Sequence, residues 1–135
     1  MAKYVYPAII EHAEDGYNVS FPDLPGCYTC GEDLAEAIAM AEDALALFLY
    51  ELETGEKSIP SPSEMKDLAC GENEIITLVY CDTLEYQKMY NKAAVKKTLS
   101  IPGWLNYMAE QASINFSQVL QDALKEKLDA NYTKS

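Results

Sequence analysis

The stretch from Val95 to Leu128 restricts the possible folds of this chain more than any other. Its first residues alternate, which predicts a strand with one partly apolar face and one polar face. Those faces carry Val95, Lys97, Leu99 and Ile101 on one side and Lys96, Thr98 and Ser100 on the other. Pro102 then ends the strand and suits the first turn of a helix. A lone strand leaves backbone donors and acceptors unpaired, so this stretch needs a partner.

Two short amphipathic helices are predicted after Pro102. The first presents an apolar face made by Leu105, Met108, Ala109 and Ala112. Asn115 is a suitable cap for the second helix, with Gln118 in the capping-box position. The apolar stripe of this second helix consists of Phe116, Val119, Leu120, Ala123, Leu124 and Leu128.

A second copy of the chain supplies the missing strand partner. Two such strands would pair antiparallel, four helices would cover one face, and the polar strand residues of both chains would form the other. A two-stranded ribbon of this kind fits the major groove of B-DNA. The motifs KKTLSIP (residues 96–102) and INFSQVL (residues 114–120) resemble the ribbon-helix-helix family of bacterial repressors.

The resemblance implies a DNA-binding role for two groups of residues. The outward strand residues Lys96, Thr98 and Ser100 would contact bases. The start of the second helix would hold a DNA phosphate through backbone N–H groups at Asn115, Phe116 and Ser117, as helix N-termini do. Thr98 and Ser100 depart from the family, in which many members carry Arg or Asn on the strand. The alternative is a C-terminal hairpin that folds back onto the main domain.

The charge distribution agrees with two separate tasks. Residues 1–87 contain 3 lysines and 18 acidic residues, a charge of −15, whereas residues 88–135 contain 7 lysines and 4 acidic residues, a charge of +3. Charge interactions are screened beyond about 8–10 Å at physiological salt, so a local basic patch can act despite the distant acidic residues. The acidic part repels nucleic acid and attracts a basic protein.

The first third of the chain is predicted to be an antiparallel meander of three strands. Residues 3–14 and 17–21 are rich in strand-forming side chains and are separated by the hairpin signal Asp15-Gly16. Residues 23–26 form a turn, and a third strand follows over Cys27–Cys30.

A long helix, a strand and a short helix complete this region. Asp33 is the predicted cap of the helix, with Glu36 in the capping-box position, and the helix ends near Gly55. Its expected inward stripe is Leu34, Ile38, Ala41, Leu45, Phe48 and Leu52. Beyond a proline-containing loop, residues 74–82 are nearly continuous in apolar side chains, which favours a strand covered on both faces. Residues 83–92 predict a short helix, and residues 91–94 a hinge.

Two further motifs carry a second resemblance. The phrase YNVSFPDLPGC (residues 17–27), followed by GEDLAEA (residues 31–37) and IPSPS (residues 59–63), is similar to the HicB antitoxin family. The resemblance implies an α+β fold, with a partial RNase H-like domain over residues 1–90 and a ribbon-helix-helix domain over residues 91–135. It implies binding of a small basic ribonuclease toxin, HicA, and repression of the shared operon by a homodimer or tetramer. The alternative is a solitary RNase H-like binding module, in which the C-terminal ribbon serves only for dimerisation.

The sequence offers little support for catalysis or a cofactor. Cys27-x-x-Cys30 lacks a second compact pair for zinc, and it is predicted on a strand rather than at a helix N-terminus, where redox pairs usually lie. Asp23 and Glu32 follow turn signals, and His12 is the single histidine. We therefore expect no enzyme activity, metal or cofactor. We also expect a cytoplasmic protein, because no apolar run is long enough to span a bilayer and no signal peptide is evident.

Overall fold

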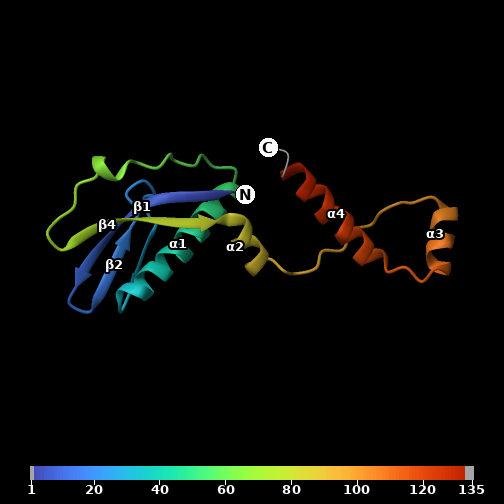
Figure 1. Cartoon of the computed structure of the whole chain (residues 1–135), viewed down its shortest axis with the longest axis horizontal. Helices are drawn as coiled ribbons and strands as arrows, with labels where there is room; N and C mark the ends of the chain where they lie inside the picture. Colours follow the sequence, from blue (N-terminus) through green and yellow to red (C-terminus); the bar gives the residue numbers. More distant parts are fainter. Residues whose placement is uncertain (1, 133–135) are drawn as a thin grey trace. The chain divides into compact units, whose positions relative to one another are not determined.

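The computed structural model describes residues 2–132, of which 130–132 are described by their backbone alone. The chain divides into two compact units, with the boundary between Ala93 and Ala94 (Figure 1). The first unit contains β1 Lys3–Ala13, β2 Gly16–Ser20, β3 Tyr28–Gly31, α1 Leu34–Thr54, the 3-10 helix η1 Met65–Asp67, β4 Glu74–Asp82 and α2 Thr83–Tyr90. The second contains α3 Gly103–Gln111 and α4 Phe116–Tyr132.

The four strands form one antiparallel sheet in the order β3-β2-β1-β4. The register places Ile10 of β1 opposite Val19 of β2, and Tyr6 of β1 opposite Val79 of β4. The predicted meander is therefore confirmed, with small shifts at the strand ends. Because β4 pairs only with β1, it forms one edge of the sheet, and β3 forms the other.

The hydrophobic core lies between one face of the sheet and α1. Alternate residues of β1 are buried there, because successive side chains of a strand point to opposite faces. The start of α1 is fixed by its predicted cap, since the backbone N–H of Glu36 donates to Asp33 Oδ1 at 2.8 Å. The principal core residues are Tyr6, Ala8, Ile10, Val19, Phe21, Leu24, Ala37, Ala41, Leu45, Leu49, Val79 and Cys81.

The stripe predicted for α1 is correct from Ala41 onward, since Ala41 is fully buried, and wrong at Leu34 and Ile38. Leu45 is buried, and Phe48 and Leu52 pack against the core, but Leu34 is 40% exposed and Ile38 is 37% exposed. The cause is the close approach of α1 to Gly31 of β3: a Cβ atom built on Gly31 would lie 2.4 Å from the backbone nitrogen of Ala37. Because α1 lies so close to β3, the small side chains of Ala37 and Ala41 fill the contact between them, and the larger side chains of Leu34 and Ile38 lie at its margins.

The prediction that β4 is covered on both faces is wrong. Val79 and Cys81 are buried against α1, whereas Leu78 is 56% exposed and Tyr80 is 50% exposed. The helix layer covers only one face of the sheet, so the apolar residues on the other face of β4 remain accessible. A run of apolar residues does not by itself reveal how many layers a sheet has.

Replacing Gly31 by alanine should destabilise the first unit. The new methyl group would meet the backbone of α1, which cannot move without disturbing the core, and overpacking of this kind costs about 1–3 kcal/mol of unfolding free energy. Gly71→Ala is the matched control, because the atom nearest to a Cβ built on Gly71 is Glu74 Oε1 at 3.2 Å, which is the end of a side chain and not backbone. Urea titration followed by circular dichroism compares the two. Equal stability of both variants would contradict the tight packing between β3 and α1.

Candidate functional site

The predicted ribbon segment lies in a part of the second unit without regular structure. Residues 91–102 belong to no helix or strand in this single chain, so the strand predicted over Val95–Ile101 is not formed here. A strand is defined by hydrogen bonds to a neighbour, and the expected neighbour was a second copy. The ribbon therefore stays a prediction.

Both helix starts of this unit are where the sequence places them. The Pro102 carbonyl accepts hydrogen bonds from the backbone N–H groups of Leu105 and Asn106, each at 3.1 Å. Asn115 Oδ1 accepts one from the backbone N–H of Gln118 at 3.1 Å. The side chain of Gln118 donates forward to Asp122 Oδ1 at 2.9 Å, so Asn115 caps the helix without the reciprocal bond of a capping box.

An apolar groove of about 630 Å³ runs between the ribbon segment and the two helices. It is lined by alternate residues of the segment and by part of the apolar stripe of each helix. Yet none of the described side chains from Ala94 to Asp129 is buried, so the apolar side chains face an open groove instead of a closed core. The lining residues are Lys97, Leu99, Ile101, Leu105, Asn106, Ala109, Ile114, Phe116, Ser117, Val119, Leu120 and Ala123.

Only one of the two faces of the predicted strand lines the groove. Lys97, Leu99 and Ile101 line it, whereas the proposed base-contacting residues Lys96, Thr98 and Ser100 are exposed and are not among its lining residues.

The three predicted phosphate-binding positions lie together at the start of α4. Asn115 caps the helix, and Phe116 and Ser117 form its first turn, where backbone N–H groups have no partner within the helix. The Phe116 and Ser117 side chains also line the groove, so a phosphate would be bound by their backbone rather than by their side chains.

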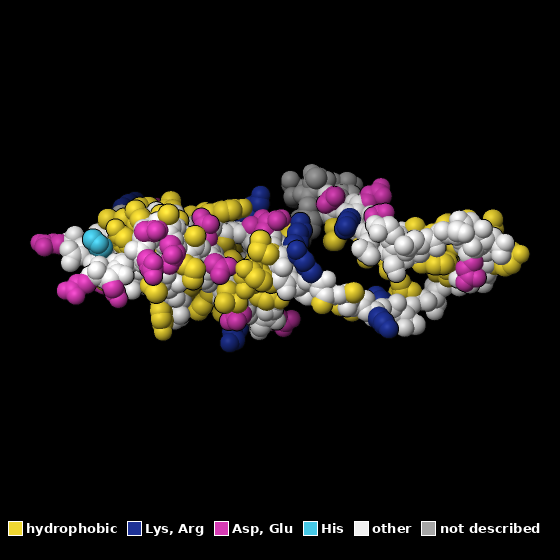
Figure 2. Space-filling view, turned by 90° about the horizontal axis from the view of Figure 1, so that it is seen from below, with side chains coloured by type: hydrophobic (Ala, Val, Ile, Leu, Met, Phe, Trp, Pro, Cys, Tyr) yellow, Lys and Arg dark blue, Asp and Glu magenta, His cyan; other side chains and the backbone are white. Residues whose placement is uncertain are grey.

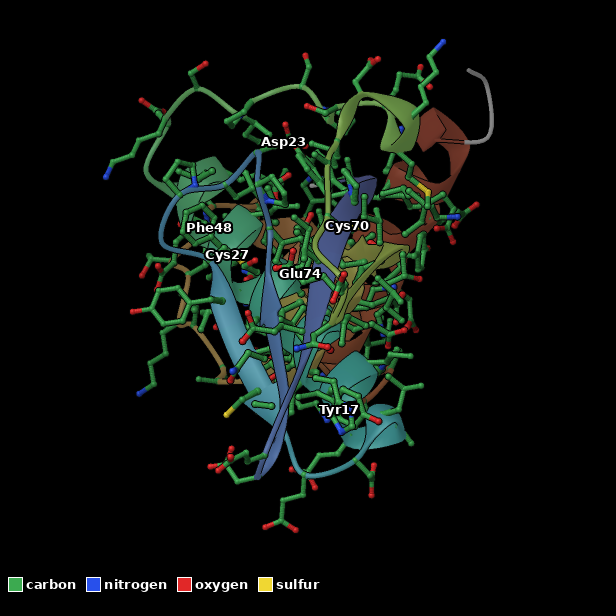
Figure 3. The ribbon with its side chains drawn as sticks, turned by 90° about the vertical axis from the view of Figure 1, so that its left-hand side faces the viewer. Tyr17, Asp23, Cys27, Phe48, Cys70 and Glu74 are labelled. Carbon is green, nitrogen blue, oxygen red and sulfur yellow. The ribbon has the colours of Figure 1, made fainter. Side chains whose placement is uncertain are left out.

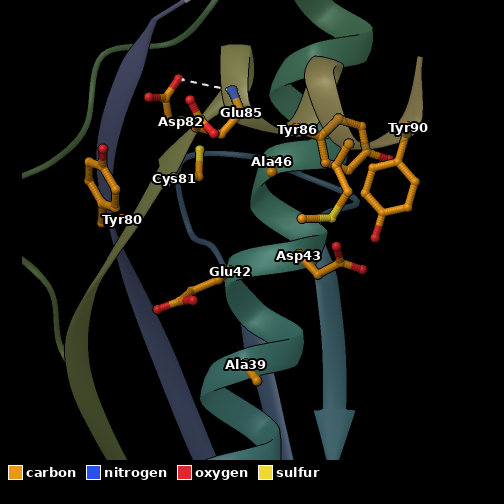
Figure 4. Close-up of a pocket in the computed structure, with 11 residues that line it drawn as sticks. Ala39, Glu42, Asp43, Ala46, Tyr80, Cys81, Asp82, Glu85, Tyr86 and Tyr90 are labelled. Carbon is orange, nitrogen blue, oxygen red and sulfur yellow. Dashed lines mark hydrogen bonds between the residues drawn. The ribbon is translucent and has the colours of Figure 1, made fainter. Parts of the chain in front are cut away.

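The first unit has a cleft of its own, between α1, β4 and α2. It has a volume of about 360 Å³ and is lined by acidic, aromatic and small side chains (Figure 4). The residues are Ala39, Glu42, Asp43, Ala46, Tyr80, Cys81, Asp82, Glu85, Tyr86, Met89 and Tyr90.

Tyrosines and carboxylates define the electrostatics of this cleft. The ring of Tyr86 lies 5.4 Å from that of Tyr50 and 4.6 Å from that of Tyr90, centroid to centroid. Burial raises the pKa of Tyr86, and the nearby carboxylate of Asp43 raises it further. The Asp82 carboxylate caps α2 by accepting from the backbone N–H of Leu84 at 2.9 Å.

The cleft lies in a strongly acidic unit. Residues 1–93 carry 18 acidic residues and five lysines, which gives a formal charge of −13. Figure 2 shows carboxylates dispersed among hydrophobic side chains over the visible face of this unit. The field of such a unit attracts cationic partners and repels nucleic acid.

The other candidate residues have structural roles. Asp23 accepts hydrogen bonds from the backbone N–H and the hydroxyl of Ser63, at 2.9 and 2.5 Å, and so fastens the loop before η1 (Figure 3). The His12 ring stacks on Tyr17 with centroids 4.7 Å apart. Cys27 is buried and Cys30 exposed. Within the described residues, no group of three His, Cys, Asp or Glu side chains is placed to hold a metal ion.

The length and composition of the helices bear on membrane insertion. Among residues 2–132, no helix combines the length and the apolar character that crossing a bilayer requires.

Comparison with known proteins identifies the family. Residues 6–124 match the family described as HicB-like antitoxin of bacterial toxin–antitoxin systems. The chain belongs to this HicB-like family. Antitoxin HicB 2 of Photorhabdus laumondii is 43% identical over 58 residues, which are 43% of this chain and 42% of that protein. The matching segment thus spans less than half of the length of this curated relative.

Solved HicB-like structures share the fold. A chain of the toxin–antitoxin complex from Streptococcus pneumoniae is 28% identical, with a TM-score of 0.61, and the match covers 93% of this chain and 99% of that one. A chain of the HicA3 and HicB3 toxin–antitoxin complex is 27% identical, with a TM-score of 0.51, over 58% of this chain and 99% of that one. The similarity confirms an α+β HicB-like fold.

Sequence reasoning did not find the cleft of this HicB-like chain. Its residues come from α1 and from the consecutive elements β4 and α2, which are separated from α1 by a long loop, so no single motif spans them. A partial signal was present in α2, where Tyr86 and Tyr90 are four residues apart and therefore share one face of the helix.

The four cysteines should react at two different rates. Burial raises the pKa of Cys27 to about 11 and that of Cys81 to about 12, from an ordinary value of 9.0, so their thiolates are scarce near pH 8. Cys30 and Cys70 are exposed. Titration with a thiol reagent at pH 8 should label Cys30 and Cys70 quickly and the buried pair only after unfolding. The double variant with Cys30→Ser and Cys70→Ser should lose the fast phase; its persistence would show that the core is open.

Proposed function

We propose that this HicB-like protein is the antitoxin of a type II HicA–HicB system. It would bind and block a small basic ribonuclease toxin and repress the operon that encodes both proteins, in the cytoplasm. The proposal rests chiefly on the similarity over 93% of the chain to a protein solved in a toxin–antitoxin complex. The acidic first unit is suited to a basic partner, and the near-neutral second unit is not a barrier to DNA.

The second unit would act as a ribbon-helix-helix dimer. Two copies placed with their grooves facing would bury the apolar side chains that one copy leaves exposed, and their 95–101 segments would pair as an antiparallel ribbon. Lys96, Thr98 and Ser100 of both copies would then share the outer face, in reach of base edges. Contacts between first units could join two dimers into a tetramer over adjacent operator sites.

The first unit would bind rather than catalyse. Its sheet order and single long helix fit a partial RNase H-like domain, the fold that the resemblance implies. Metal-dependent nucleases of that fold need several carboxylates converging on a cation. The acids of this unit instead cap helices, fasten loops or lie at exposed positions, which supports a binding role.

Growth of cells that express the neighbouring small open reading frame tests the antitoxin role. Expression of that frame alone should arrest growth, and co-expression of this chain should relieve the arrest. A variant that lacks residues 94–135 separates toxin blocking from repression. Absence of arrest, or arrest without relief, would contradict the antitoxin function.

Lys96→Ala should weaken operator binding. If Lys96 pairs with a DNA phosphate, the slope of log affinity against log salt should shrink by about one unit, because one phosphate fewer is neutralised. If it pairs with a base, the sequence preference should relax instead. Lys57→Ala, which removes the same charge from the first unit, is the matched control. Fluorescence anisotropy with operator DNA at several salt concentrations measures the affinity and the salt slope of both variants. Equal affinity of the two variants for the operator would contradict the DNA-binding assignment. Toxin binding should be unchanged in both.

A further inference from the structure

The cleft between α1, β4 and α2 exposes side chains that proteins usually cover. Tyr90 is 61% exposed and Met89 is 63% exposed, although both line one concavity, and Figure 4 shows the Tyr90 ring in its α2 wall. Tyrosine and methionine are enriched in the buried centres of protein interfaces. A concave group of such residues indicates a protein-binding surface.

One wall of this cleft is a strand edge that lacks the usual protection. Tyr80, Cys81 and Asp82 belong to β4, which pairs with β1 on one side only. Edge strands are normally shielded by lysine, by proline or by shortness, because their free backbone groups invite another chain. β4 is nine residues long, and its sequence EIITLVYCD contains neither lysine nor proline.

The charge of the lining selects the kind of partner. Glu42, Asp43, Asp82 and Glu85 line the cleft, and no lysine is found among its described lining residues. Lys88, which neighbours it, is engaged by Glu85 at 3.4 Å. Glu85 is thus paired with Lys88, and Asp82 caps α2. A partner that brings lysine or arginine side chains would therefore meet chiefly the uncompensated charges of Glu42 and Asp43.

A second copy of this chain is a poor occupant. Antiparallel pairing of β4 with its own copy about Leu78 would set Glu74 opposite the second copy's Asp82, twice, and like charges directly opposite each other are destabilising. Each first unit also carries a formal charge of −13, so a second copy would bring the same net negative charge to this acidic cleft.

We propose that this cleft is the surface that holds the basic toxin, an inference that rests on the proposed function. A lysine or arginine side chain of the toxin inserts between Asp43 and the rings of Tyr86 and Tyr90. Figure 4 shows the Asp43 and Tyr90 side chains at the same end of the cleft. The carboxylate pairs with the cation, and the ring faces add a cation–π attraction. The body of the toxin covers Met89 and the free edge of β4.

Toxin binding by full-length variants tests this proposal. The variants Asp43→Lys and Tyr90→Ala should each weaken binding on the order of 30-fold or more, which is the effect of losing a hot-spot residue of an interface. For Tyr90→Ala the weakening should lie in faster dissociation, since groups buried in an interface govern that rate. Surface plasmon resonance with the purified toxin measures both rates. Tyr90 is mostly exposed, so its removal leaves the fold intact, which thermal unfolding checks.

The matched control is Asp15→Lys, which makes the same charge change in the turn between β1 and β2, away from the cleft residues. It should slow association slightly and leave dissociation unchanged. Wild-type affinity of the two cleft variants, with toxin bound by the wild-type chain, would overturn the cleft assignment alone. Failure of the wild-type chain to bind would overturn the proposed function as well. Loss of tetramers in Asp43→Lys with unchanged toxin affinity would assign the cleft to a second copy, against the proposal.

Discussion

The second unit depends on a hydrophobic interior that one chain cannot close. Its ribbon segment and both helices direct apolar side chains into a common groove, yet no described side chain from Ala94 to Asp129 is buried. Each square ångström of apolar surface removed from water stabilises by about 25 cal/mol, so closing the groove is the main source of stability open to this unit. Closure of the groove by a second copy, as proposed, would link association to folding and would make the stability of this unit depend on protein concentration.

The first unit, in contrast, buries its hydrophobic core within a single chain. It closes its own core between α1 and one face of the sheet, and it leaves one face of β4 and the cleft beside α2 accessible. Its charge of −13 contrasts with +1 for residues 94–135. Two units with different fields and different open surfaces are suited to two different partners.

The features that the sequence predicted correctly are those set by neighbouring residues. The hairpin at Asp15-Gly16, the cap at Asp33 and the helix start after Pro102 each depend on a few adjacent side chains. Ile38 on α1 and Leu78 on β4 were expected to be buried and are exposed, because their burial depends on how closely the layers approach and on how many layers there are. The cleft was missed for the same reason. The base-contacting face was predicted from alternation, and it stays a prediction because its partner strand belongs to a second chain.

The carboxylates of this protein show why an acidic domain need not be an enzyme. Asp33 and Asp82 accept backbone hydrogen bonds at the starts of α1 and α2, and Asp23 fastens a distant loop through Ser63. These carboxylates accept hydrogen bonds from neutral donors of the fold, and they thereby fix two helix starts and one loop. The carboxylates of Glu42 and Asp43 are exposed at a cleft, where their charge acts on whatever approaches. Catalysis by carboxylates requires convergence on one point, whereas recognition of a basic surface requires only that negative charge be spread over a complementary shape.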